Sequence, residues 1–244
     1  MAGNFFETKQ CTKVRVQAAG GRIVKFNKNE ILLTVGDYGN WKVAQNENSI
    51  FGKIISINEE SKEYKIISMG HRNPQGLKYI KKNNLIISTE HGPKGGDEVN
   101  IINLNETVNK NYGWPISSYG YHYDGKQRNY APLHKSHKDH GFIEPLIYFT
   151  PSIGISEILQ VDDLFEVDDV NHFLVSSLGY PDQIDEGDQS LHLIKLNKEN
   201  KSLSNYKIEQ IIINERIRDF QLVDKQIIMA LESSPALGIV YKVN

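Results

Sequence analysis

Apolar and polar residues alternate along most of the chain with the period of two that is typical of β-strands, whereas long stretches with helical period are scarce. The segment RIVKFNKNEILLTVGD (22–37) predicts two strands joined by a polar turn at 27–29. The segment FGKIISINEESKEYKIISMG (51–70) predicts a second hairpin with its turn at 58–62. Together these segments supply four strands.

The same order of elements returns further along the chain. Each unit has an apolar strand, a polar turn, a strongly apolar strand that ends in a polar loop, and an outer hairpin. The later units are QGLKYIKKNNLIISTEHGP with DEVNIINL, SEILQVDDLFEVDDVNHFLVSSLGY with SLHLIKLNKENKSLSNYKIEQIIIN, and a partial copy, IRDFQLVDKQIIMALESS with GIVYKVN. This repeat is expected of β-propeller blades, and it predicts an all-β fold with three blades and a partial fourth.

The predicted organisation is one partial β-propeller domain over residues 1–244. Gly, Pro, His and Tyr break the repeat at about 112–147, which predicts a long loop insertion there. A closed propeller usually has four to eight blades, so the chain either closes as a very small ring or lacks blades at its N-terminal side.

Composition excludes several classes of function. Lys and Arg number 28 against 30 Asp and Glu, so the formal charge of −2 makes nucleic-acid binding unexpected. Cys11 is the single cysteine, which excludes an internal disulfide and a metal site built from several cysteines. No apolar run is long enough to cross a bilayer, and MAGNFFETKQ has no features of an export signal. The chain is therefore expected to be soluble.

Polar residues follow or precede several of the predicted strands. Arg72 and Asn73 stand together in HRNPQGL, where Pro74 predicts a loop before the next strand, and Arg216 and Arg218 stand where the last unit begins. Strand ends at one rim of a propeller converge around its central channel, and forked guanidinium groups suit a ligand with several carboxylates. The alternative is that these arginines are surface residues or partners of acidic side chains.

Two further motifs indicate metal sites, each with a plain alternative. In EHGPKGGDEVN, the backbone carbonyls of the Gly and Pro residues and the carboxylates of Asp97 and Glu98 could form an oxygen cage for calcium, or the segment is an ordinary glycine-rich turn. In HKSHKDH, His134, His137 and His140 could gather a transition metal on a loop, or the loop is simply solvated. Trp41 and Trp114 are expected to be packing residues.

The ordered motifs GGRIVKF, LLTVGDYGN, FGKIISIN, HRNPQGL, EHGPKGGDEVN, NYGWP and ERIRDF resemble the glucose/sorbosone dehydrogenases. These are soluble sugar dehydrogenases that depend on pyrroloquinoline quinone (PQQ) and are built as six-bladed β-propellers. The resemblance runs from about Gly20 to Val243 and implies that roughly the first third of the family's domain is absent.

The resemblance assigns roles to particular residues of this chain. It implies that Arg72 and Asn73 contact the quinone and that Arg216 and Arg218 bind its carboxylates. It also implies that the carbonyls of Gly92 and Pro93 bind the calcium ion that polarises the quinone. A looser inference is a second, structural calcium site, with the residues Asp97, Glu98 and Tyr112.

The implied reaction is transfer of a hydride from the anomeric carbon of an aldose to the quinone, with an electron acceptor that the sequence does not identify. The resemblance also implies a periplasmic or secreted protein. Two positions depart from the family's pattern. Ala18, preceded by Gln17, stands where the family has its His base, and Gly179 stands where better-studied members have a Lys that contacts the cofactor. Loss of a general base predicts slow turnover.

Two alternatives to the dehydrogenase hypothesis remain open at the level of sequence. One is a propeller without catalytic activity that binds a ligand or a partner, which the loss of the base favours. The other is a calcium-dependent, lactonase-like hydrolase, for which Asp37 and Glu90 are the candidate acidic ligands.

Overall fold

The structure is a computed structural model that describes residues 17–107, 110–166, 169–179, 189–197 and 208–241. In these residues it contains fifteen strands, β1 to β15, and three short 3-10 helices, η1 to η3. The strands form three four-stranded sheets and one three-stranded sheet, each built from strands that are consecutive in the sequence. The predicted all-β fold is confirmed.

The first sheet contains both predicted hairpins, with turns where the polar residues were expected. Its strands pair antiparallel in the order β1-β2-β3-β4. They are β1 (Gly20–Lys25), β2 (Glu30–Val35), β3 (Lys53–Asn58) and β4 (Tyr64–Met69).

The other three sheets follow the repeat units of the sequence. The second contains β5 (Pro74–Ile80), β6 (Leu85–Glu90), β7 (Asp97–Asn103) and β8 (Ile147–Phe149). The third contains β9 (Ile155–Gln160), β10 (Val170–Ser177), β11 (Ser190–Asn197) and β12 (Glu209–Ile212), and the fourth β13 (Ile217–Val223), β14 (Gln226–Leu231) and β15 (Ala236–Tyr241). Pro74 is the first residue of β5, a position where the missing N–H of proline is tolerated.

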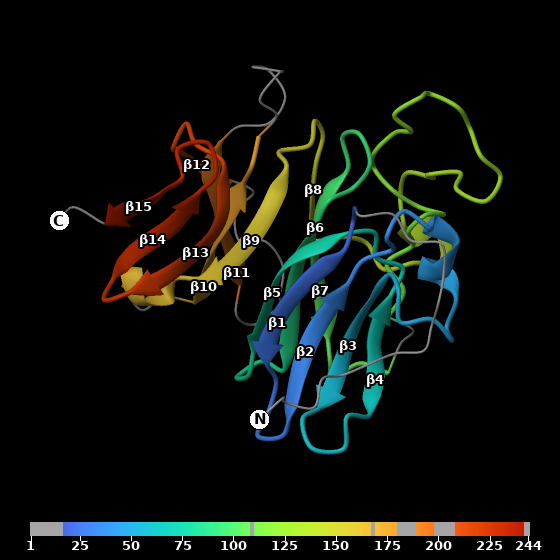
Figure 1. Ribbon diagram of the computed structural model, residues 1–244, viewed down its shortest axis with the longest axis horizontal. Coiled ribbons are helices and arrows are strands. Elements are labelled where there is room, and N and C mark those ends of the chain that lie inside the picture. The colour runs from blue at the N-terminus through green and yellow to red at the C-terminus, as the bar shows by residue number, and fades with distance from the viewer. Residues whose placement is uncertain (1–16, 108–109, 167–168, 180–188, 198–207, 242–244) are drawn as a thin grey trace.

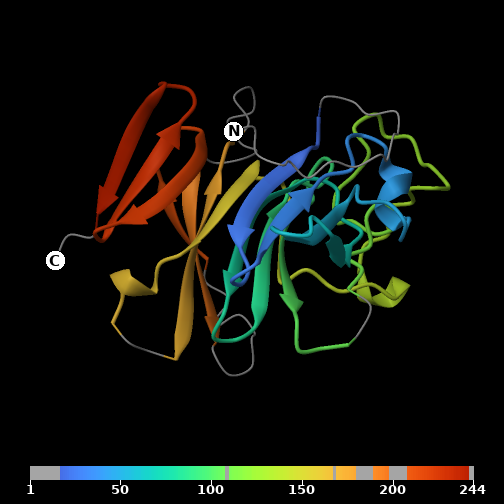
Figure 2. The same ribbon diagram turned by 60° about the horizontal axis from the view of Figure 1, so that its bottom comes forward.

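The four sheets stand side by side as the blades of a partial propeller (Figures 1 and 2). The first strands of consecutive sheets contact one another, β1 with β5, β5 with β9, and β9 with β13, so these strands line the inner side. Apolar side chains pack between neighbouring sheets. Buried residues of these interfaces include Leu32, Ile54, Leu77, Ile86 and Ile102 between the first two sheets, Ile87, Val99, Ile155 and Val175 between the next two, and Leu174, Leu191, Phe220 and Met229 between the last two. This burial is the main stabilising contribution.

One guanidinium group joins the inner strands of all four sheets. Arg22 on β1 forms an ion pair with Glu157 on β9, lies 3.0 Å from Asp219 Oδ2 on β13, and donates from Nε to the carbonyl oxygen of Gln75 on β5 at 3.3 Å. Burial raises the pKa of Glu157 to about 7, although the ion pair with Arg22 opposes this rise. The blades are therefore fastened together at their inner edge by a buried charge and its partner.

Between β7 and β8, the described residues 104–107 and 110–146 contain the 3-10 helix η2 (Lys138–His140) and no strand. The other two short helices are η1 (Trp41–Gln45), after β2, and η3 (Asp162–Leu164), after β9. None of the helices in the described residues is long and apolar enough to traverse a lipid bilayer.

Candidate functional site

A cavity of about 690 Å³ lies where η1, the turn before β5, the turn after β6 and the loop before β8 meet. Its walls come from segments that are far apart in the sequence. The described lining residues are Gln17, Ala18, Gly39, Asn40, Trp41, Lys42, Arg72, Asn73, His91, Gly92, Tyr123, Arg128 and Tyr130. A concave site with converging polar groups of this size is the usual form of a small-molecule site.

Positive groups face this cavity. Lys42, Arg72 and Arg128 are among the described lining residues, and none of those residues carries a carboxylate. Arg128 is held by a bidentate pair with Asp124, with distances of 3.1 and 2.7 Å. The wall therefore favours an anionic ligand.

Arg72 has hydrogen-bonding capacity left over. Its Nη1 donates to the carbonyl oxygens of His91 at 3.0 Å and Gly92 at 2.7 Å, whereas its Nε is buried and has no hydrogen-bond partner. A buried N–H without a partner is costly, but an atom that is closed to solvent is also closed to a ligand in the cavity. A ligand would therefore meet Arg72 through the outer nitrogens of its guanidinium group, which the two carbonyl oxygens hold in the wall.

Aromatic rings give the cavity flat walls. Trp41 lies under the guanidinium group of Arg128, with 5.4 Å from Cζ to the ring centroid, and the Nζ of Lys42 lies 4.9 Å from the centroid of Tyr130. Trp41 packs against the cluster of Ala44, Trp114 and Leu133, as expected of a packing residue, and it also lines the cavity. Trp114 is buried, with 4% of its surface exposed, as expected.

A fully buried lysine holds η1 in place. The Nζ of Lys53 donates to the carbonyl oxygens of Val43 at 3.1 Å, Ala44 at 2.8 Å and Phe51 at 2.9 Å. All three ammonium protons are thereby used, and burial lowers the pKa of Lys53 to about 8. Lys53 fixes the helix that presents Trp41 and Lys42. Its place in an ordinary alternating strand gave no sign of this role.

The two carboxylates considered for a hydrolase support the wall from behind. Asp37 accepts hydrogen bonds from Trp114 Nε1 and Gly39 N, both at 2.7 Å. Glu90 accepts from Arg72 N at 2.9 Å and from Asn100 Nδ2 at 3.0 Å. Because both are buried and neither lines the cavity, the hydrolase alternative gains no support.

Asp37 predicts a pH dependence of stability. Burial raises its pKa to about 6 from the model-compound value of 3.8, so the folded state holds this proton more tightly than the unfolded state. The associated stability is present at acid pH and is lost as the pH rises through 6, with an upper bound of about 3 kcal/mol. We expect the fall in unfolding free energy between pH 4 and pH 7, measured by urea titration, to be smaller in Asp37→Asn than in the wild type. Equal slopes would contradict this account.

The structure brings some of the sequence-predicted residues together. Arg72, Asn73 and Gly92 line the cavity, and so do Ala18, at the position that matches the family's base, and Gln17 before it. Asn73 Oδ1 accepts from Gly20 N at 3.1 Å, which ties the start of β1 to the cavity wall. Ala18 has a φ of +53°, in the left-handed region.

Other predicted residues lie outside this wall. Arg216 donates from Nη1 to the carbonyl oxygens of Leu178 at 3.0 Å and Gly179 at 2.9 Å, and Arg218 forms an ion pair with Glu232. Neither arginine is among the described lining residues. The backbone oxygen of Gly179 is thus a partner of Arg216.

The residues predicted for the second calcium site, Asp97, Glu98 and Tyr112, already have hydrogen-bonding or ion-pair partners. Asp97 accepts from Gly92 N at 3.2 Å and from Ile155 N at 2.9 Å. Glu98 Oε1 lies 3.3 Å from His137 Nε2, and the carbonyl oxygen of Tyr112 lies 2.9 Å from His137 Nδ1. Burial raises the pKa of Glu98. For His137, burial acts to lower the pKa, but the contact with Glu98 outweighs this effect, and the pKa of His137 is raised.

The three histidines of HKSHKDH do not converge on one point. The rings of His134 and His140 stack on the surface with centroids 3.9 Å apart, whereas His137 is buried against Glu98. Within the described residues, no group of three or more His, Cys, Asp or Glu side chains is arranged to hold a metal ion.

Comparison with known proteins agrees with the fold. The sequence model of the glucose / sorbosone dehydrogenase family matches residues 4–239. Aldose sugar dehydrogenase YliI of Escherichia coli is 31% identical in an alignment of 150 residues that covers 56% of this chain and 38% of that protein. Quinoprotein glucose dehydrogenase B of Acinetobacter calcoaceticus is 30% identical in an alignment of 155 residues that covers 49% of this chain and 30% of that protein. The chain thus matches less than half the length of these relatives.

Solved structures of similar fold have related names. The soluble aldose sugar dehydrogenase of Escherichia coli in its apo-form superposes with a TM-score of 0.71 at 24% identity, over 91% of this chain and 64% of that one. The PQQ-bound form of an aldose sugar dehydrogenase from Streptomyces coelicolor superposes with a TM-score of 0.57 at 18% identity, over 88% of this chain and 56% of that one. At these identities the similarity supports the fold alone.

Proposed function

The chain belongs to the glucose/sorbosone dehydrogenase family, and from this membership we propose that it is a sugar oxidoreductase whose cavity binds PQQ. The observation that carries the proposal is the cavity wall itself. It combines Arg72, anchored by the carbonyl oxygens of His91 and Gly92, with Lys42 and with the flat rings of Trp41 and Tyr130. Such a wall fits a planar ligand with several carboxylates.

The names of similar proteins support this choice of cofactor. One relative is named a quinoprotein, and one similar structure is a PQQ-bound form. In this chain, Arg72 would bind a carboxylate and Asn73 would contact the quinone from the turn before β5. Arg216 and Arg218, which the resemblance also assigns to the carboxylates, lie outside the cavity wall and already have partners, so we propose no direct contact of either with the quinone.

Calcium forms the second part of the proposed cofactor. The carbonyl oxygens of Gly92 and Pro93 would hold the ion at the edge of the cavity, since hard cations prefer oxygen ligands. Gly92 already accepts from Arg72, and Pro93 accepts from Gly96 N at 3.1 Å. A carbonyl oxygen has a second lone pair, so these bonds leave each oxygen able to bind a cation.

When bound, the quinone would supply the chemistry by accepting a hydride from the anomeric carbon of an aldose, and the calcium ion would polarise the quinone for this step. The chain's own residues bind and orient the reactants. Ala18 offers no group that takes the sugar's hydroxyl proton, so loss of the base at this position makes turnover slow. We also propose a periplasmic or secreted location.

Reduction of an artificial acceptor tests the proposal. Protein with PQQ and calcium should reduce the acceptor slowly when an aldose is added. Arg72→Ala should abolish this activity because it removes the guanidinium group from the cavity wall, whereas Arg218→Ala should retain most of it because Arg218 is half exposed and paired with Glu232. If no aldose supports turnover while the quinone is bound, the catalytic claim fails.

Binding without turnover is the second candidate function, and Ala18 is the observation that favours it. A cavity that keeps its cationic groups but has Ala18 at the position of the family's base binds the quinone, or another planar anion, as a ligand. Rapid aldose oxidation that is lost in Arg72→Ala would exclude this candidate.

A further inference from the structure

The loop between β7 and β8 keeps a defined shape without a strand ladder in its described residues 110–146. Ordering so many residues costs conformational entropy, which other contacts must offset. The shape matters because Tyr123, Arg128 and Tyr130 of this loop line the cavity. Whatever fastens the loop therefore also determines the form of the candidate site.

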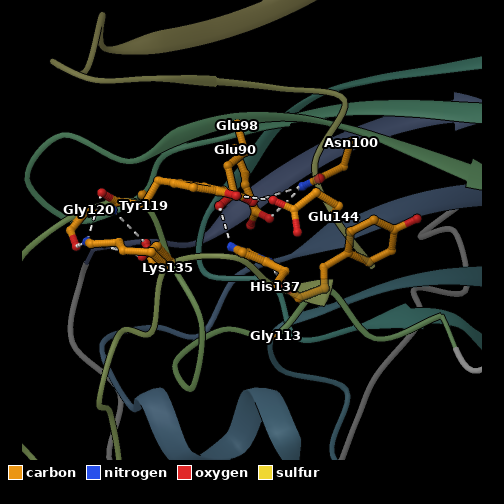
Figure 3. A network of polar contacts seen from close by, with 12 residues as sticks. Glu90, Glu98, Asn100, Gly113, Tyr119, Gly120, Lys135, His137 and Glu144 are labelled. Atoms are coloured by element: carbon orange, nitrogen blue, oxygen red, sulfur yellow. Dashed lines mark hydrogen bonds and ion pairs between the residues drawn. The ribbon is translucent and has the colours of Figure 1, made fainter. Parts of the chain in front are cut away.

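The first fastening point is the ammonium group of Lys135. Its Nζ lies 3.3 Å from the carbonyl oxygen of Ser118 and 2.9 Å from that of Tyr119, and it donates to the carbonyl oxygen of Gly120 as well (Figure 3). It also lies 3.8 Å from the ring centroid of Tyr121. Three successive carbonyl oxygens turned toward one point form a cage suited to a hard cation, and here three N–H donors fill it.

The second fastening point is the imidazole ring of His137, two residues further on. Nδ1 donates to the carbonyl oxygen of Tyr112 at 2.9 Å, and Nε2 lies 3.3 Å from Glu98 Oε1 (Figure 3). His137 is 1% exposed. The ring thereby connects the start of the loop to the buried acidic group on β7.

The place that a second cation would take is thus filled by this ring. Both oxygens of Asp97 accept backbone N–H groups, and His137 stands between the carbonyl oxygen of Tyr112 and Glu98. The cavity beside Glu98, Tyr112 and His137 measures about 10 Å³. The ring nitrogens of His137 thus face both Glu98 and the carbonyl oxygen of Tyr112, the two oxygen donors that a cation here would have to share. In this arrangement these residues do not fit a calcium ion.

We propose that Lys135 and His137 replace bound cations in this loop, so that the loop keeps its shape without a divalent metal ion. The inference does not depend on quinone binding, and it is tested on protein that contains no quinone. A failure of the proposed oxidoreductase function would leave it unaffected.

Thermal unfolding in excess calcium and in EDTA tests the part played by Glu98. Calcium bound at Gly92 and Pro93 would shift the melting temperature of the wild type and of Glu98→Gln equally, because Glu98 is not a ligand there. We expect equal shifts in the two proteins. If calcium raised the melting temperature of the wild type but not that of Glu98→Gln, a metal ion would bind at Glu98, and the proposal would be overturned.

Limited proteolysis by chymotrypsin tests Lys135, since Tyr121, Tyr123 and Tyr130 are exposed in the loop. Lys135→Ala empties the carbonyl cage, so we expect cleavage about tenfold faster than in the wild type in EDTA, with protection restored by calcium. Lys138→Ala, at an exposed lysine of η2, is the matched control and should be cleaved at the wild-type rate.

Three results of the proteolysis would contradict the proposal. Lys135→Ala could be cleaved no faster than the wild type, or the wild type could become as sensitive as the variant once calcium is removed. Calcium could also fail to slow cleavage of the variant, which would mean that the three carbonyl oxygens are not a cation site. Because the wild-type measurements need no variant, misfolding of a variant does not remove the test.

Discussion

Replacing Ala18 by His should raise the rate of aldose oxidation by the quinone-loaded protein about 10²- to 10⁴-fold, the usual contribution of a positioned general base. Ala18 lines the cavity and its φ is +53°. His is one of the residues that adopt this left-handed conformation more often than most, so the backbone accommodates the change. The gain should appear in kcat and rise with pH through the pKa of the new imidazole, near 6.5.

Ala18→Phe is the matched control for this prediction. It adds a ring of similar size at the same position but provides no group that accepts a proton, so the rate should not rise. If Ala18→His binds the quinone as the wild type does and turns over no faster, position 18 does not face the sugar's hydroxyl group, and the proposed orientation of the site is wrong.

Arg22→Met should lower the free energy of unfolding by about 3 to 5 kcal/mol at pH 8, the usual effect of removing one partner of a buried ion pair. The variant leaves Glu157, with 5% of its side chain exposed, without its partner and releases the link between β1, β9 and β13. Because burial already raises the pKa of Glu157 to about 7, its protonation should reduce the loss at pH 5. Urea unfolding at the two pH values measures both effects.

A surface pair on the same strand provides the comparison. Lys25 pairs with Glu59, and both side chains are about half exposed, at 56% and 44%, so Lys25→Met should cost less than about 1 kcal/mol. Arg22→Met should also cost much less in a Glu157→Gln background, where no buried charge is left behind. Equal losses for Arg22→Met and Lys25→Met would show that the inner ion pair does not fasten the blades.

The sheets were predictable from the sequence because each strand has one partner close by along the chain. The hairpins over 22–37 and 51–70 follow directly from alternation and from polar turns, since a period of two fixes which side chains face a neighbouring sheet. Arg72, Asn73 and Gly92 were also predicted for the site, and the structure places all three on the cavity wall.

The rest of the wall was not predictable, because it depends on contacts between distant segments. Lys53 belongs to an ordinary alternating strand, yet its Nζ is held by three carbonyl oxygens of η1 and its neighbourhood. Trp41 follows a glycine-containing loop, a position that often carries function, but only the fold brings it beside Arg128 of the long loop.

Equilibrium titration with PQQ, with and without calcium, tests the central claim that this cavity is a quinone site. The account predicts calcium-dependent binding of one quinone per chain, weakened at least about 30-fold in Arg72→Ala, the loss expected when a buried donor to a charged ligand is removed. Arg218→Ala should bind nearly as the wild type does. Absence of binding to a folded wild-type protein, or equal binding by Arg72→Ala, would contradict the claim.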